Sequence, residues 1–265
     1  MSATVYLEGI GVIGPGLVDW PATAAILRGE APWSPAATQP PPPENLPPAE
    51  RRRTGPGVRL ALAVGRQAIA ASGRDAATLP AVFSASSADG HNFHAINEAL
   101  VSDDPMISPT RFHNSVHNAP AGYWSIATGS MAASNAMCGH DASFGAGLLD
   151  ACAQVVAHRE PCVLISYDTD YPEPLRGARP IPDLLGVALV LAPDRGPAAI
   201  AALTVDLVDD APTALAHPDL ETLRGRIPAA RALPLLHALA HDRSAAVVLD
   251  YLDTIRLRID VARCR

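Results

Sequence analysis

The sequence contains no lysine, and all 20 of its basic residues are arginine. A chain without a side-chain amine is excluded from Schiff-base chemistry and from every other lysine-dependent mechanism. Cysteine is scarce as well: no two of the four cysteines stand at C-x-x-C spacing, and no histidine stands at zinc-finger spacing from them. The sequence therefore predicts neither a bound metal nor a cofactor.

Long apolar runs and concentrated basic charge are also missing. The longest apolar stretches, 186–192 and 245–252, have the length of a strand and fall far short of the roughly 20 residues that cross a bilayer. The net charge is −7 and the arginines are dispersed, which argues against nucleic acid as a partner. The sequence shows no signal-peptide pattern, so we expect a cytoplasmic protein with reduced thiols and no membrane attachment.

The patterns that are present indicate an α/β fold. With 265 residues, 48% of them apolar, the chain is expected to form a single domain, 1–265, with a substantial core. Strand-like and helix-like patterns alternate, which is typical of a layered mixed sheet packed with helices. Strands are expected at 4–10, 81–86, 132–135, 161–166, 186–192, 199–208 and 254–261, helices at 20–29, 58–72, 94–100, 121–128, 144–156 and 233–240, and either form at 245–252.

Loop signals refine this pattern. Residues 31–56 hold a dense proline cluster and are expected to form an irregular surface loop. The short Asp194-Arg195-Gly196 turn predicts antiparallel pairing of the two strands that flank it. Asp168 and Asp170 follow a strand, where they would either bind a cation or belong to an ordinary polar loop, and we prefer the polar loop.

The N-terminal glycines at 9, 11 and 14 match the pattern G-x-G-x-x-G. This match offers one functional hypothesis, a small-molecule binding protein in which the glycine-rich turn holds a phosphate. Pro15 follows at once, and no acidic residue stands at the expected distance along the chain. A structural turn after the first strand is therefore the preferred interpretation.

Small residues crowd the segment 135–151, which reads N-A-M-C-G-H-D-A-S-F-G-A-G-L-L-D-A. A sharp turn followed by a Gly/Ala-rich helix is how a nucleophile elbow is built. Aligning the turn on Gly147 puts the reactive position near Gly139, and a one-residue slip puts Cys138 there. A thiol at a helix N-terminus beside His140 would be reactive, but we prefer to interpret Cys138 as a small apolar filler, as buried cysteines often are.

The order of the segments resembles the N-terminal half of a β-ketoacyl synthase, a thiolase-like condensing enzyme. The resemblance rests on I-G-V-I-G-P at 10–15, on 113–129 with H-N-A-P-A-G at 117–122, and on 135–151 with the strands at 161–165 and 186–191. It covers nearly the whole chain up to about residue 207 and leaves 208–265 as a divergent C-terminal tail. The resemblance implies a thiolase-like half-fold.

The same resemblance implies catalytic groups that this chain lacks. A condensing enzyme carries a second half with a G-T-pattern histidine, a lysine and a G-H-pattern histidine, and nothing after residue 207 resembles these. The chain looks most like the short stand-alone ketoacyl-synthase-like proteins of aryl polyene and related fatty-acid-like pathways, which resemble chain-length factors. We therefore expect an accessory subunit without independent activity; the alternative is a free-standing acyltransferase with Cys138 as nucleophile, assisted by His140.

The resemblance also implies a partner and the surface that meets it. A half-fold leaves apolar surface that needs a cover, so we expect a heterodimer with a full-length β-ketoacyl-ACP synthase through 108–122. Phe112, His113, His117 and Asn118 would lie at this interface, with Phe112 and His113 reaching toward the partner's acyl tunnel. An acyl carrier protein is a second candidate partner, with the arginines at 51–53 as either its contact or a solvated turn.

Overall fold

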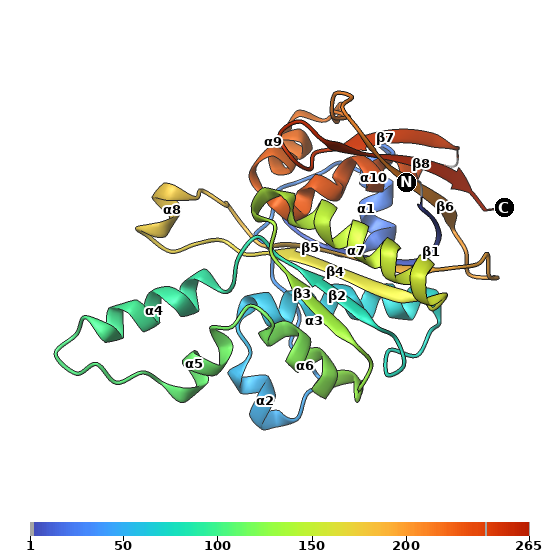
Figure 1. The fold of residues 1–265 in the computed structure, drawn as a ribbon. Coiled ribbons are helices and arrows are strands. Elements are labelled where there is room, and N and C mark those ends of the chain that lie inside the picture. The colour runs from blue at the N-terminus through green and yellow to red at the C-terminus, as the bar shows by residue number, and fades with distance from the viewer. Residues whose placement is uncertain (1–2, 242, 265) are drawn as a thin grey trace.

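The computed structural model describes residues 3–241 and 243–264 (Figure 1). Its strands are β1 (Ala3–Ile13), β2 (Ala81–Ser84), β3 (Ser134–Met137), β4 (Cys162–Asp168), β5 (Leu185–Ala192), β6 (Ala201–Val208), β7 (Ala245–Leu249) and β8 (Arg256–Arg263). Its helices are α1 (Trp20–Leu27), α2 (Pro48–Arg53), α3 (Pro56–Ser72), α4 (Gly90–Leu100), α5 (Pro109–Asn114), α6 (Ala119–Thr128), α7 (Ser143–His158), α8 (Leu175–Ala178), α9 (Pro218–Arg226) and α10 (Leu233–Ala240). Two short 3₁₀ turns complete the set, η1 (His140–Ala142) and η2 (Pro228–Ala232).

The strands form one mixed sheet in the order β3-β2-β4-β5-β1-β6-β8-β7. β2 is parallel to β3 and β4, and every other neighbouring pair is antiparallel. β1 lies between β5 and β6, so that Leu7 stands opposite Leu191 on one side and Ala201 on the other. The pairing predicted from the Asp194-Arg195-Gly196 turn is therefore wrong, because β1 takes the hydrogen bonds of both flanking strands.

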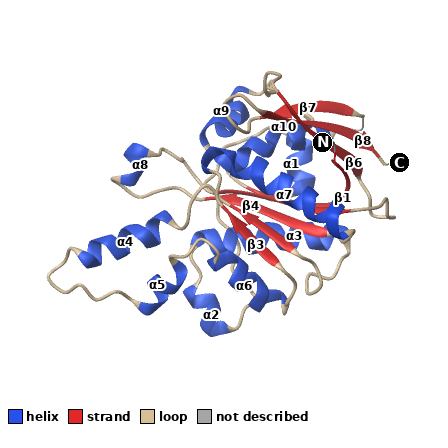
Figure 2. Cartoon of the chain, viewed as in Figure 1, coloured by secondary structure: helices blue, strands red, loops and turns tan. Residues whose placement is uncertain are grey.

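Helices cover both faces of the sheet, as the layered α/β prediction requires (Figures 1 and 2). One apolar cluster joins α3 and α6 to one face, and the larger cluster joins α1, α7, η2 and α10 to the other. Every residue of β4 and β5 is buried. Strands that are covered on both faces read as unbroken apolar runs, which is why these two were visible in the sequence.

The N-terminal glycines serve packing. β1 extends to Ile13, so Gly9 and Gly11 lie inside the strand, and the turn begins only at Gly14. A Cβ on Gly9 would lie 2.1 Å from the carbonyl oxygen of Ala68, and a Cβ on Gly11 would lie 2.0 Å from that of Val64. The backbone of α3 fills the space above these glycines, and the phosphate-cradle hypothesis is wrong for them.

The proline-rich range 31–56 is irregular over most of its length, but not throughout. Pro48–Arg53 forms α2, and Pro56 begins α3. Proline fits the first turn of a helix, because the amide that it lacks has no partner there in any case. The expectation that prolines exclude regular structure from this range is therefore wrong at its C-terminal end.

The C-terminal segment is part of the packed body. β8 pairs with β6 along eight residues and with β7 on its other side. Leu233, Leu235 and Leu236 of α10 are fully buried. The described residues after 208 thus continue the sheet and one helical layer, and the range 245–252, which the sequence left open, begins with the strand β7.

Candidate functional site

The turn between β3 and α7 is the candidate site. β3 was expected at 132–135 and lies two residues later, at Ser134–Met137, parallel to β2. Cys138 and Gly139 follow, then η1, and α7 begins at Ser143. The hydroxyl of Ser143 accepts a hydrogen bond from the Gly139 amide at 3.0 Å and donates one to the His140 carbonyl at 2.7 Å. These two bonds close the turn.

Small residues let α7 lie directly on the sheet, as the crowding in the sequence indicates. A Cβ on Gly147 would lie 2.6 Å from the Ser84 hydroxyl oxygen, beneath the helix. A Cβ on Gly145 would lie 2.8 Å from the ring of Tyr251. The first half of α7 is therefore held against β2 and β4.

The apex of the turn is His140. Its φ of +51° lies in the left-handed region, whereas Gly139 has an ordinary φ of −123°. The reactive residue of a nucleophile elbow occupies the sharp, strained part of the turn. The structure therefore moves the apex one residue beyond Gly139, where the sequence placed it, and two residues beyond Cys138.

The apex imidazole is held by a charged network. Nη1 of Arg179 donates to Nε2 of His140 at 2.7 Å, since a guanidinium has no acceptor atom. Asp141 binds Nη2 of Arg179 at 2.6 Å and lies 3.5 Å from Nη2 of Arg231. Partial burial works to raise the pKa of Asp141, but the hydrogen bond and charge of Arg179, with Arg231, hold it below its usual value. The group at the apex is thus an arginine-bound imidazole in place of a thiol.

Cys138 is exposed, and its thiol faces a carbonyl. Sγ donates to the Ser86 carbonyl oxygen at 3.1 Å. This contact uses the thiol proton, which a cysteine nucleophile must give up. No hydrogen bond among the described residues joins Cys138 to His140, so the two candidate catalytic side chains have separate partners. The exposure of Cys138 also means that it is not the buried filler that we expected.

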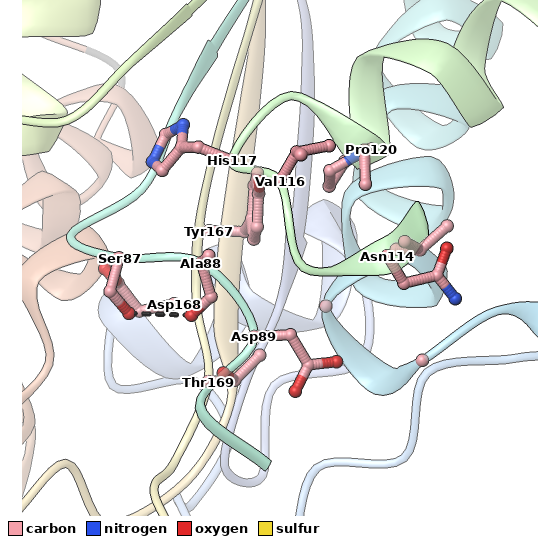
Figure 3. A pocket seen from close by; sticks show the side chains of 14 residues that line it. Ser87, Ala88, Asp89, Asn114, Val116, His117, Pro120, Tyr167, Asp168 and Thr169 are labelled. Carbon is pink, nitrogen blue, oxygen red and sulfur yellow. Dashed lines mark hydrogen bonds between the residues drawn. The ribbon is translucent and has the colours of Figure 1, made fainter. Parts of the chain in front are cut away.

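His117, like Cys138, contacts the backbone of the segment that follows β2. Its Nε2 is 3.3 Å from the carbonyl oxygen of Ala85, the residue before Ser86. His117 also lines a small cavity of about 20 Å³ together with Tyr167 and Asp168 (Figure 3). A cavity of this size holds about one water molecule and no acyl chain.

The other three interface candidates lie on the outer side of α5 and α6. Phe112 is 67% exposed. His113 is exposed and packs edge-on against Tyr123, with ring centroids 6.1 Å apart. Asn118 is exposed at the start of α6. Phe112, His113 and Asn118 are therefore open to a partner, whereas His117 points into the body.

Asp168 has a structural role that the polar-loop interpretation missed. It is 3% exposed and accepts hydrogen bonds from the amides of Ser86 at 2.8 Å and Ala229 at 2.7 Å. Burial raises its pKa to about 6, against the opposing effect of these hydrogen bonds. Asp168 thus ties the end of β4 to β2 and η2, while Asp170 lies at the surface, 3.3 Å from His91. The available signal was an acid that ends an otherwise apolar strand.

Comparison with known proteins identifies the family. A model of the β-ketoacyl synthase N-terminal domain matches residues 27–250. The chain belongs to this family. No curated protein matches the chain.

Solved structures share the ketosynthase fold. A chain of the ketosynthase ApeO in complex with its chain length factor ApeC from Xenorhabdus doucetiae is similar at a TM-score of 0.70 and 20% identity, covering 97% of this chain and 99% of that one. A chain of AntDE:AntF, a type II polyketide synthase acyl-carrier protein with its ketosynthase, reaches 0.75 at 12% identity, with 99% and 100% covered. A bacillaene ketosynthase from Bacillus amyloliquefaciens reaches 0.55 at 13% identity, with 78% of this chain and 46% of that chain covered. These likenesses confirm the thiolase-like half-fold.

Two further findings concern metal binding and membrane-spanning helices. Across residues 3–241 and 243–264, no three histidine, cysteine or acidic side chains are grouped so that they could hold a metal ion. Over the same residues, no helix is long and apolar enough to span a bilayer.

Proposed function

We propose that this β-ketoacyl-synthase-like chain is a non-catalytic subunit that pairs with a full-length β-ketoacyl-ACP synthase and helps to shape its acyl tunnel. The observation that carries this proposal is the distribution of exposed apolar side chains. Among the described residues, 13 large apolar side chains are exposed, and eight of them lie between residues 93 and 131. These eight are Phe93, Leu100, Val101, Met106, Phe112, Val116, Ile126 and Met131.

Five of these side chains, from Phe93 to Phe112, lie on α4, on α5 or on the loop between them, a part of the chain that extends away from the sheet. Figure 1 shows α4 and α5 projecting from the body, with α6 beside β3. β3 is one of the two edge strands, and Ser134, Asn135 and Ala136 are exposed along it. An open strand edge and a stretch of chain with many exposed apolar side chains both favour association with another protein. A stable interface of this kind buries about 1,200–2,000 Å² in total.

The geometry of the turn supports a role without its own condensation chemistry. A decarboxylative condensation needs an activated nucleophile and donors that stabilise a developing oxyanion. Here the apex is His140, bound by Arg179, and the thiol of Cys138 donates to a backbone carbonyl. The absence of lysine removes a further group that condensing enzymes use.

The same proposal includes the partners of the chain, its pathway and its location in the cell. The similar chains come from complexes of ketosynthases with a chain length factor or an acyl-carrier protein, which supports a synthase as the partner and a carrier protein as a second one. The sequence resemblance supports a fatty-acid-like or aryl polyene pathway as part of this proposal. All four cysteines are free, which suits a cytoplasmic location.

Co-expression with a full-length synthase from the same genome tests the proposal, with size exclusion and light scattering as the readout. We expect a one-to-one complex. Phe112→Glu should break it, because a charge would replace an exposed apolar side chain at the interface. Leu207→Glu is the matched control, since Leu207 is 56% exposed but lies on β6, away from the proposed interface. A chain that stays alone beside the synthase, or equal effects of both variants, would contradict the proposal.

A free-standing acyltransferase is the second candidate, and the exposure of Cys138 is the observation that favours it. This function requires a covalent thioester on Cys138 when the chain is mixed with an acyl-CoA or an acylated carrier protein. Intact-protein mass spectrometry measures the adduct, and Cys138→Ala must abolish it. An unmodified wild-type chain under excess donor would exclude this candidate.

A further inference from the structure

A cavity of about 160 Å³ lies next to the turn that carries His140, and four arginine side chains line it. Its charged lining residues are Arg179, Arg224, Arg226, Arg231 and Asp141. The side chains of three of these arginines are only 15–22% exposed. Partly buried charge of one sign is costly unless a counterion is present.

The four arginines reach the cavity from separate parts of the chain. Arg179 directly follows α8, Arg224 and Arg226 belong to the last turn of α9, and Arg231 lies in η2. A cation in the last turn of a helix is stabilised by the helix dipole, which accounts for Arg224 and Arg226 as structural residues. The dipole of α9 does not account for the other two, so the convergence needs another explanation.

The acidic side chain on the lining does not balance these cations. Arg224 pairs with Glu221 and Asp250. Arg179 and Arg231 share Asp141, the one carboxylate among the described residues that line the cavity beside the four guanidinium groups.

The other contacts of these four arginines also leave hydrogen-bond donors available. Arg226 is exposed, and its guanidinium donates to the Pro180 carbonyl at a long 3.4 Å. The Nε of Arg179 is buried without an acceptor among the described residues. The lining of the cavity thus carries more positive than negative charge, together with guanidinium donors that are weakly used.

We propose that this cavity binds a phosphoryl group, either inorganic phosphate or the phosphate of an ester. Guanidinium groups recognise oxyanions through paired hydrogen bonds. Donors that come from three segments can surround an anion, and this arrangement suits a tetrahedral oxyanion. A planar carboxylate can instead be bound by a single arginine from one side. A cavity of 160 Å³ has room for an anion of several water volumes, at about 30 Å³ per water. The anion site goes beyond the partner-subunit role and does not depend on it.

Titration calorimetry of the full chain with sodium phosphate tests the site. Sodium chloride and sodium acetate at matched ionic strength are the reference titrations, and glycerol phosphate is a separate arm. We expect saturable one-to-one binding of phosphate and no comparable binding of chloride or acetate. Tighter binding of glycerol phosphate would assign the site to an ester, and equal binding would assign it to the free anion. Acetate binding as tight as phosphate binding would overturn the proposal.

Two variants and one control locate the binding. Arg226→Gln and Arg231→Gln each remove one guanidinium from the cavity and should weaken phosphate binding roughly tenfold, the usual worth of a charge-assisted hydrogen bond. Arg52→Gln removes the same charge from the exposed α2, far from α9 in Figure 1, and should leave the affinity unchanged. Circular dichroism confirms that each variant is folded. Phosphate affinity that is the same in all three variants as in the wild type would overturn the site.

Discussion

Replacing Gly11 by alanine should destabilise the whole sheet. The added Cβ would lie 2.0 Å from the Val64 carbonyl oxygen and 3.0 Å from the Ala68 amide nitrogen, both backbone atoms of α3. Ordinary contact begins at 3.4 Å, so α3 must retreat from β1 by more than 1 Å. Overpacking costs about 1–3 kcal/mol, and a contact between two backbones belongs at the upper end, about 3 kcal/mol. Urea unfolding should show a midpoint lower by about 1 M with an unchanged slope.

Gly122→Ala is the matched control for this prediction. Gly122 lies within α6, and nothing stands within 4 Å of an added Cβ. Alanine in a helix interior stabilises by about 0.5–1 kcal/mol over glycine, so the midpoint should rise slightly. If Gly11→Ala were as harmless as Gly122→Ala, the glycines of β1 would not be there for helix packing.

Two further predictions concern titration and thiol reactivity. The pKa of Asp168, raised by burial to about 6, exceeds its unfolded value of about 3.9, so stability from its protonated form is lost as pH rises. The unfolding free energy of the wild type relative to Asp168→Asn should therefore fall by about 2 kcal/mol between pH 4 and pH 7, and a pH-independent difference would refute this. Burial also raises the pKa of Cys152 and of Cys162 to about 12, so a thiol reagent at pH 8 should modify exposed Cys138 well before either. Similar rates for the three thiols by peptide mass spectrometry would contradict that order.

Local patterns in the sequence predicted the central elements and missed those without a continuous apolar signal. β4, β5, α3 and α7 were found because burial leaves dense apolar runs or stripes in them. α9 was not found, because only Leu220 and Leu223 are buried in an otherwise polar segment. The order of the strands was beyond local reasoning, since the insertion of β1 between β5 and β6 joins segments about 190 residues apart in the sequence.

The sequence predicted the type of turn at the candidate site but not which residue lies at its apex. The small residues of 135–151 indicated the turn and its helix, and the structure has both. His140 lies at the apex because of the way in which Ser143 closes the turn. Moving the apex by one residue along the chain would fit the sequence pattern equally well, so the pattern alone does not identify it. The arginine network had no local signal at all, because Arg179 meets Asp141 from 38 residues away in the chain.

The measurement that tests the central claim most directly is the length of the acyl products made by the partner synthase, read by mass spectrometry. The synthase is assayed with the wild-type chain, with Phe112→Ala and with Cys138→Ala. Phe112 is exposed on the surface proposed to meet the tunnel, so its truncation should shift the products toward longer chains. Cys138→Ala should leave both rate and length unchanged. Loss of product with Cys138→Ala, or the same products with and without the chain, would contradict a tunnel-shaping subunit that performs no chemistry of its own.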